Sequence, residues 1–317
     1  MTKAESLVEN CTNTGNVVLN MTAVENTGQS TGTNRVRTAG IVAAPRGNIS
    51  GCTNKGKVEC YAVTTTRESL GVTKNKNYSI CPGGVTGGIQ DWGNAKDVGM
   101  NVTNCINEGE VVVDADVDNN NSTVGGVVSH PGYEDASNQN TIQGCINRGN
   151  ITVTGTGKFR VGGISGGMGN VIGCENYGTV KLATNDKGKA AGSCVAGITG
   201  YMGKGLKFEN NKNYGNVIED TPLVHCVGGL IAQTNKQKAT YGAGCIVKCA
   251  VTTKSSVTKA GMVLGFIEPD YTTCGTVENP VKVSGSFNGT AITAENIAAT
   301  AQGTESSAVA MNVVVGE

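Results

Sequence analysis

A seven-residue phrase, Cys-x-Asn-x-Gly-x-Val/Ile, recurs along the chain and constrains its fold more than any other feature. Five copies begin at Cys11, Cys52, Cys105, Cys145 and Cys174. A sixth copy begins at Asn211, with Asn in place of the Cys, and residues 75–78 read as a degenerate copy between the second and third. Apart from the 53 residues between Cys52 and Cys105, the copies are 29 to 41 residues apart, which is typical of stacked repeats. In such an array each unit buries its apolar face only against its neighbours.

A second phrase, small-Gly-aliphatic, alternates with the first. Its copies begin at Ala39, Gly83, Gly125, Gly162, Ala196, Gly228 and Ala260. Each repeat therefore holds at least two short segments with alternating apolar positions, separated by Gly and Asn that favour bends. We predict an all-β chain, a right-handed parallel β-solenoid (β-helix) of about seven coils. Its handedness follows the strong preference of parallel crossover connections.

The composition agrees with a thin core. Aromatic residues make up 4% of the chain and hydrophobic residues 38%, while glycines number 47. Stacked coils need few large side chains, because like residues pack on like residues. We expect residues 1–275 to form the solenoid and 276–317 a small C-terminal cap of β structure and one helix. Thr293 would cap that helix and Gly303 would end it, and the cap would block edge-to-edge growth.

The charge balance argues against two classes of partner. The chain has 25 basic and 25 acidic side chains and no basic stripe, so nucleic acids and anionic membranes are poor partners. No apolar run approaches the length of a membrane span. The first residues lack the charged-then-apolar pattern of a leader. Either the protein is cytosolic or it is exported and its leader is not part of this sequence; we favour export.

Five of the 12 cysteines share one position of the first phrase. Residues at a shared register stack about 4.8 Å apart, which is wider than the Cβ separation of about 3.8 Å that a disulfide prefers. Paired zinc-type spacings are absent. We predict a ladder of buried free thiols and leave isolated disulfides open for the other cysteines. The ladder residues, with the asparagines expected at equivalent bends, are Cys11, Cys52, Cys105, Cys145, Cys174, Asn54, Asn107, Asn147 and Asn176.

Residues 161–166, Val-Gly-Gly-Ile-Ser-Gly, followed by 172–180, Ile-Gly-Cys-Glu-Asn-Tyr-Gly-Thr-Val, resemble the GLUG-type repeats of bacterial surface proteins. The resemblance covers residues 8–265, and the tail from Pro280 is similar to the closing segment of such proteins from gut Bacteroidales. Several copies lack the Gly or Cys, and a long insert separates the second copies of the two phrases. The resemblance implies an adhesin-like surface protein and transfers no catalytic signature.

Chemistry-bearing residues are sparse. His130 and His225 are the two histidines, and neither has a partner at the spacing of a metal site or a catalytic triad. Asp91 and Trp92 form the pair most typical of a carbohydrate contact, because an exposed indole can stack on a sugar ring. Together with His130 and Tyr133, they are our candidates for ligand binding.

Asp114, Asp116 and Asp118 alternate in a strand-like stretch, so their carboxylates should share one face. Such a face could bind Ca²⁺, and the alternative is a solvated acidic edge; no other cofactor is expected. If the longest inserts leave the solenoid on one side, they make a shared ligand rim. These inserts are 59–80, 90–101, 114–123 and 129–143.

The pattern favours a non-catalytic module, exported to the cell surface, that acts as an adhesin-like or spacer element and presents loops to a glycan or a host protein. The main rival is a carbohydrate-active enzyme, a polysaccharide lyase or glycoside hydrolase on a β-helix, which needs paired carboxylates or an acidic and basic cluster. A third reading is a filament subunit that stacks end to end. Fold alone does not choose among them.

Overall fold

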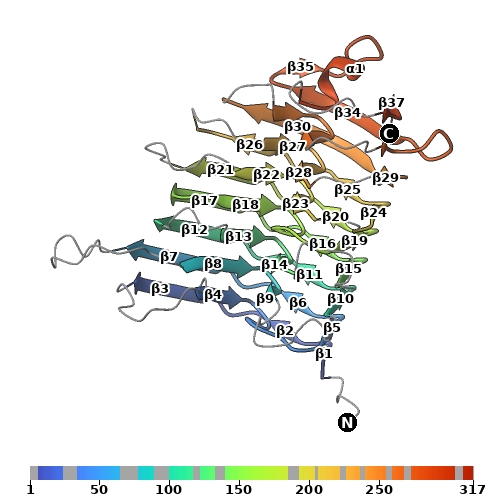
Figure 1. Ribbon diagram of the computed structural model, residues 1–317. Helices are drawn as coiled ribbons and strands as arrows, with labels where there is room; N and C mark the ends of the chain where they lie inside the picture. Colours follow the sequence, from blue (N-terminus) through green and yellow to red (C-terminus); the bar gives the residue numbers. More distant parts are fainter. Residues whose placement is uncertain are drawn as a thin grey trace.

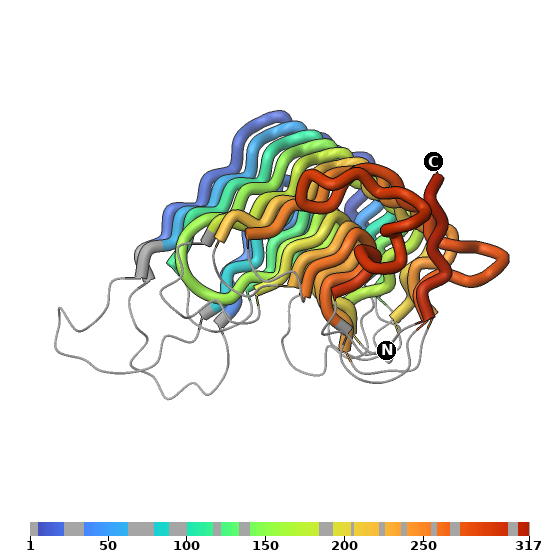
Figure 2. Tube along the Cα trace, turned by 90° about the horizontal axis from the view of Figure 1, so that it is seen from above, coloured from blue at the N-terminus to red at the C-terminus, as the bar shows by residue number. Residues whose placement is uncertain are grey.

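The computed structural model describes residues 6–23, 34–64, 78–88, 100–116, 122–132, 140–184, 193–203, 206–221, 226–235, 240–254, 259–267, 273–303 and 310–316. Over these residues the chain is a parallel β-solenoid (Figure 1). Each coil repeats the same strands, and like strands lie above one another when the molecule is viewed down its axis (Figure 2). The predicted fold class is confirmed.

Three columns of stacked parallel strands form the outer path of each coil. The leading column contains β1 (Leu7–Glu9), β5 (Asn48–Ser50), β10 (Asn101–Thr103), β15 (Thr141–Gln143), β19 (Asn170–Ile172) and β24 (Phe208–Glu209). The corner column contains β2 (Thr12–Asn13), β6 (Thr53–Asn54), β11 (Ile106–Asn107), β16 (Ile146–Asn147), β20 (Glu175–Asn176) and β25 (Lys212–Asn213). The long column contains β3 (Val17–Ala23), β7 (Val58–Thr64), β12 (Val111–Asp116), β17 (Ile151–Thr156), β21 (Val180–Thr184) and β26 (Val217–Glu219).

Two further columns complete the coil. The inner column contains β4 (Asn34–Ala39), β8 (Tyr78–Gly83), β13 (Ser122–Gly125), β18 (Phe159–Gly162), β22 (Cys194–Ala196), β27 (Cys226–Gly228) and β31 (Ala260–Gly261). The return column contains β9 (Thr86–Gly88), β14 (Val128–His130), β23 (Thr199–Met202), β28 (Ile231–Thr234) and β32 (Leu264–Ile267). Between β14 and β23, Ser165 bridges Val128 to Thr199.

The return column folds back over the outer face of the inner column. Within one coil, the hydroxyl oxygens of Ser129 and Thr123 lie 2.9 Å apart. A Cβ atom added at Gly166 would lie 2.8 Å from the Cβ of Thr123, so small residues are needed where the two columns meet. One added at Gly126, in the turn between the columns, would lie 2.5 Å from the amide carbon of Asn147, one coil on. The second-phrase turn is therefore packed against the corner column.

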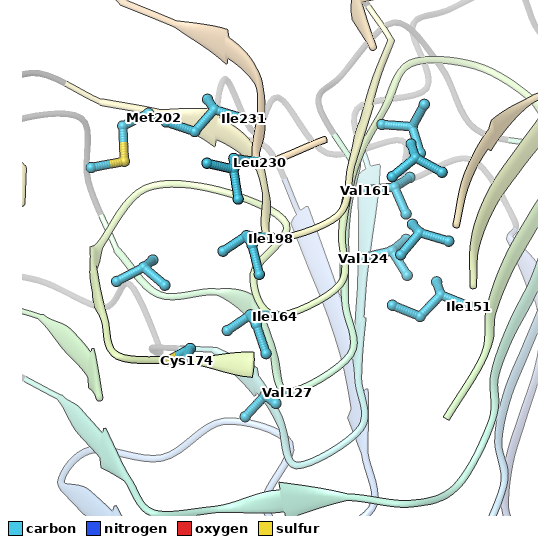
Figure 3. Close-up of a cluster of buried hydrophobic side chains, with 14 of the residues drawn as sticks. Val124, Val127, Ile151, Val161, Ile164, Cys174, Ile198, Met202, Leu230 and Ile231 are labelled. Atoms are coloured by element: carbon cyan, nitrogen blue, oxygen red, sulfur yellow. The ribbon is translucent and has the colours of Figure 1, made fainter. Parts of the chain in front are cut away.

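Apolar side chains inside the coils form one continuous core. Figure 3 shows a stack at the turn between the inner and return columns, made of Val127, Ile164, Ile198 and Leu230. On the other side, Val124 and Val161 of the inner column lie beside Ile151 of the long column (Figure 3). All of these side chains are fully buried. Each contributes about 1.5–3 kcal/mol by burial, so aliphatic residues stabilise the fold with few aromatic ones.

A ladder of asparagine amides runs up the corner column. Except in the last member, each Nδ2 donates to the Oδ1 of the Asn one coil on, at 2.8 Å. It also donates to the carbonyl oxygen of the Gly two residues on, at 2.7 to 3.0 Å. An unpaired buried amide would cost about 1–3 kcal/mol, so a fully paired ladder holds one register. Its members are Asn13, Asn54, Asn107, Asn147, Asn176 and Asn213.

The phrase cysteines stack beside this ladder without forming disulfides. Every cysteine of the chain is a free thiol, and Cys11, on the first coil, is the one that is exposed. Buried members donate to carbonyl groups, as Cys145 Sγ does to Val102 O at 3.4 Å. In the sixth copy Asn211 replaces the thiol: its Oδ1 accepts from the backbone N–H of Cys174 at 2.9 Å. Among the cysteines outside the phrase, burial raises the pKa of Cys60 to about 12.

The corner changes in the next coil, where one strand, β30 (Ile246–Thr253), pairs with both β25 and β26. Its register places Val247 opposite Asn213, and Cys249 follows two residues later, where other coils have Gly. The last amide of the ladder, Asn213 Nδ2, lies 3.2 Å from Cys249 Sγ. Residues 245–251 are thus a copy of the first phrase that lost both its Asn and its Gly.

The degenerate copy expected at 75–78 is wrong. Asn54 pairs directly with Asn107, so no coil intervenes between the second and third copies. Tyr78 begins β8 in the inner column, and residues 75–77 lie outside the described residues. The extra chain length is an insertion within one coil.

Beyond residue 275, β34 (Val281–Phe287) continues the parallel stack on β30. It then forms an antiparallel pair with β35 (Thr290–Ala291), and β37 (Val313–Val315) pairs with it in parallel. A short column beside it contains β29 (Thr240–Tyr241), β33 (Thr273–Cys274) and β36 (Ala310–Met311). The helix, α1 (Ile297–Thr300), begins after Asn296, so the expected cap at Thr293 is wrong. No helix of the described residues is long and apolar enough to cross a membrane.

Candidate functional site

Each coil has one open edge, where the long column connects to the inner column and the return column connects to the next leading strand. In the coil described without gaps, residues 157–158 make the first connection and 168–169 follow the return segment. The bond between Ser129, near the end of β14, and Thr123, near the start of β13, places both connections on the same side. In Figure 2 the described strands end along the lower side of the view.

The four inserts predicted from the sequence begin at this edge. They are not the four longest, because the connections at 24–33 and 185–193 are longer than those at 117–121 and 133–139. The strands that precede the four inserts, β7, β9, β12 and β14, end at Thr64, Gly88, Asp116 and His130. Strands extend into stretches expected as loops, because the stacked neighbours supply hydrogen-bonding partners for residues such as 114–116. The remaining insert residues, 65–77, 89–99, 117–121 and 133–139, lie outside the described residues.

The sequence-predicted ligand residues fall into two groups. Asp91, Trp92 and Tyr133 lie outside the described residues, as does His225. His130 is the last residue of β14 and pairs with Gly88, the last residue of β9. The described strands that precede Asp91, Trp92 and Tyr133 in the sequence therefore end at adjacent positions of neighbouring coils.

His130 is buried, with 2% of its surface exposed, and its Nδ1 has no hydrogen-bond partner. Burial lowers the pKa of His130 well below 6.5, and the positive charges of Arg35, Arg37 and Arg160 lower it further. The imidazole is therefore neutral at physiological pH, with one nitrogen as donor and the other as acceptor. Two of the three arginines come from β4 and the third from β18.

Arg160 is a site residue that the sequence analysis missed. The residue is 5% exposed, and its Nε and Nη1 have no hydrogen-bond partner. The guanidinium carbon lies 3.6 Å from the centre of the Tyr201 ring, one coil on. Arg160 stands between two core residues, Phe159 and Val161, and that pattern was the available signal, because a strand covered on both faces buries its alternate residues too.

The outer face of the inner column carries a row of polar and sulfur-containing side chains at one register. Arg37 pairs with Cys81, Thr123 pairs with Arg160, and Arg160 pairs with Cys194. Thr123 Oγ1 and Cys81 Sγ are 3.5 Å apart, which joins the two halves of the row. The return column covers this face. The row, in chain order, is Arg37, Cys81, Thr123, Arg160, Cys194 and Cys226.

Asp114 and Asp116 lie on the exposed face of β12. Each accepts a hydrogen bond from a threonine one coil on: Thr154 Oγ1 to Asp114 at 3.0 Å and Thr156 Oγ1 to Asp116 at 2.8 Å. Asp118, the third member of the candidate calcium site, lies outside the described residues. Within the described part of the chain, no three His, Cys, Asp or Glu side chains gather as a metal site would require.

The described part of the open edge thus holds a neutral imidazole beside guanidinium groups. Guanidinium N–H groups form charge-assisted hydrogen bonds to carboxylate, sulfate or phosphate oxygens. A neutral imidazole can donate to the same acceptor through one nitrogen. The chemistry of this cluster is that of anion recognition.

Comparison with known proteins adds no relative: no family model, no curated protein and no solved structure matches this chain.

Proposed function

We propose that this chain is a non-catalytic, adhesin-like module of an exported bacterial surface protein, which binds a glycan or a host protein through the open edge of its coils. One observation carries the proposal. The connections that vary in length lie at a single edge, while the corner column on the outer path is held by a repeating hydrogen-bond ladder. Solenoids often bind through the face on which their insertions gather.

The repeat pattern supports the bacterial surface assignment through its resemblance to GLUG-type repeats. A rigid rod with a ladder-locked register also suits a spacer, because each coil contacts only its neighbours and adds length along the axis. The proposal needs no cofactor.

The experiment uses the chain's own short connections. Residues 157–158, Gly-Lys, replace 117–121 in one variant, and residues 168–169, Met-Gly, replace 133–139 in another. Wild type and both variants are applied to arrays of glycans and host surface proteins. Binding that falls at least tenfold in an insert variant supports the proposal. The proposal is contradicted if binding is unchanged in both insert variants and in Trp92→Ala but is lost in Tyr177→Ala, a substitution on the exposed corner face.

A turnover assay addresses the rival enzyme assignment. Pectins, mucin glycans and glycosaminoglycans are incubated with the protein, and new reducing ends and unsaturated products are measured. We expect none. Turnover that a single substitution such as Asp116→Asn abolishes would show that the chain is an enzyme.

A further inference from the structure

Arg160 holds a buried charge for which the fold supplies little compensation. Nε and Nη1 lack hydrogen-bond partners, and no carboxylate of the described residues pairs with the guanidinium. Among the described residues, the guanidinium contacts the ring face of Tyr201, which attracts a cation but accepts no strong N–H···O bond. A buried guanidinium in this condition is unfavourable unless something else accepts its hydrogen bonds.

His130 lies in the same neighbourhood, as the strand register shows. Thr123 is the register partner of Arg160 in the adjoining coil. Thr123 also hydrogen-bonds Ser129, the residue next to His130. These contacts bring β14 close to β18, and the charge of Arg160 acts on His130. Nδ1 of His130 is a second buried polar atom without a hydrogen-bond partner.

Positive charge converges on this point from several strands. Arg35 and Arg37 of β4 act on His130 from the N-terminal side, and Arg160 acts from the C-terminal side. The field of Arg160 and Lys158 also reaches Cys194, whose pKa is lowered first by the hydrogen bond from Cys226 and then by these charges. These positive charges repel a cation, whereas each of them attracts an anion.

We infer that Arg160 and His130 form an anion-binding site at the open edge, which takes the carboxylate or sulfate group of an acidic glycan. The anion supplies acceptor oxygens for Arg160 and an acceptor for an imidazole N–H. The glycan part rests on the proposed function, whereas the anion site stands on the unpartnered donors alone. Carboxylate and sulfate share the recognition chemistry, and the test separates them.

The two histidines make the site directly observable by NMR, because the ring C–H signals of His130 and His225 are the only ones of their kind. His130→Gln assigns the signals. Sodium sulfate and sodium acetate are titrated first, at constant ionic strength with chloride as the balancing anion. We expect a saturable shift of the His130 signal and a rise of its titration midpoint by at least one pH unit, since a bound anion favours imidazolium.

Arg160→Met and Arg160→Lys test the guanidinium. We expect Arg160→Met to weaken sulfate binding about tenfold or more and Arg160→Lys to restore part of it. Arg148→Gln is the matched control, because Arg148 is a half-exposed arginine of the corner face, 3.6 Å from Glu108. It should bind like wild type. A His130 signal that ignores sulfate and acetate, or that shifts equally in Arg160→Met, would overturn the site.

Oligosaccharides then identify the source of the anion. A sulfated glycosaminoglycan fragment, an oligogalacturonate and neutral dextran are compared on the same signal. We expect one acidic oligosaccharide to shift His130 and dextran to leave it unchanged. A response to inorganic sulfate but to no glycan would keep the anion site and overturn its glycan assignment. Glycan binding without a His130 shift would support the proposed function and refute this site.

Discussion

The corner column and the open edge both bury polar side chains, and they differ in how those side chains are paired. In the corner, Asn147 donates both amide hydrogens and accepts one hydrogen bond, all at 2.8 Å. At the edge, Arg160 is nearly as buried, and two of its nitrogens have no partner. A fully paired polar group fixes register at little cost, while an unpaired one costs free energy that only a ligand or solvent recovers. The paired side chains of the corner column therefore stabilise the fold, whereas the unpaired groups of the open edge suit ligand binding.

The largest loss of stability should come from adding a side-chain atom at a corner glycine, where two coils are in close contact. A Cβ at Gly149 would lie 1.8 Å from the backbone oxygen of Gly109, which cannot move aside without shifting a coil. We expect Gly149→Ala to lose about 4 kcal/mol of unfolding free energy or more. Gly173→Ala is the control: φ is +62° and nothing lies within 4 Å, so only the left-handed conformation costs, about 1–2 kcal/mol. Urea unfolding measures both, and equal losses would mean that close approach is unimportant.

Next in size is the loss of a ladder amide. Asn147→Ala leaves the Nδ2 of Asn107 without one acceptor and the Oδ1 of Asn176 without its donor. We expect a loss of about 3 kcal/mol in chemical denaturation. Asn13→Ala, at the exposed end of the ladder, should lose less than about 1 kcal/mol because water replaces the missing partner. An Asn147→Ala protein as stable as wild type would contradict the structural role of the corner.

His130, at the open edge, should make the stability of the protein depend on pH. The folded pKa of His130 is lowered from 6.5, first by burial, while the unfolded chain titrates near the ordinary value. Between those two values the unfolded state binds more protons, so stability falls as pH decreases. Below pH 6.5, wild type should lose up to about 1.4 kcal/mol per pH unit more than His130→Gln. Parallel curves for the two proteins would show that His130 is not held neutral.

The smallest effect is the most telling, because it has the opposite sign from the corner variants. Replacing a buried, unpaired charge by an apolar side chain of similar length is often neutral or stabilising. In the absence of added anion, Arg160→Met should change the unfolding free energy by about 0 to 1 kcal/mol in the stabilising direction. A loss as large as that of Asn147→Ala would make Arg160 a structural residue.

The stacking of the coils could be read from the sequence, because two phrases at regular spacing demand equivalent strands. The ladder residues Asn54, Asn107, Asn147 and Asn176 repeat between a Cys and a Gly, which marks a bend with a polar requirement. Their contact with second-phrase glycines, such as Gly126 against Asn147, was beyond reach. It depends on how far the chain rises along the solenoid axis within one coil, and the spacing of the phrases in the sequence does not determine that rise.

Two features were not predicted from the sequence, for different reasons. The copy at 245–251 has Val247 for Asn and Cys249 for Gly, and it keeps the apolar alternation while straightening the corner into β30. The burial of Arg160 was not predicted, because alternation in a strand suggests that one face is exposed to solvent. The return column covers that face instead, and the turn that folds it back is encoded by two glycines rather than by any charge pattern.

The division of roles between the corner column and the open edge is tested by the stabilisation that sulfate gives to wild type, Asn147→Ala and Arg160→Met. A ligand that binds only the folded state raises the unfolding free energy by an amount set by its concentration and Kd. We expect Asn147→Ala to start less stable than wild type and to keep the full sulfate increment. We expect Arg160→Met to start at least as stable as wild type and to lose the increment. Equal increments in all three proteins, or an increment lost in Asn147→Ala and kept in Arg160→Met, would contradict the division between corner and edge.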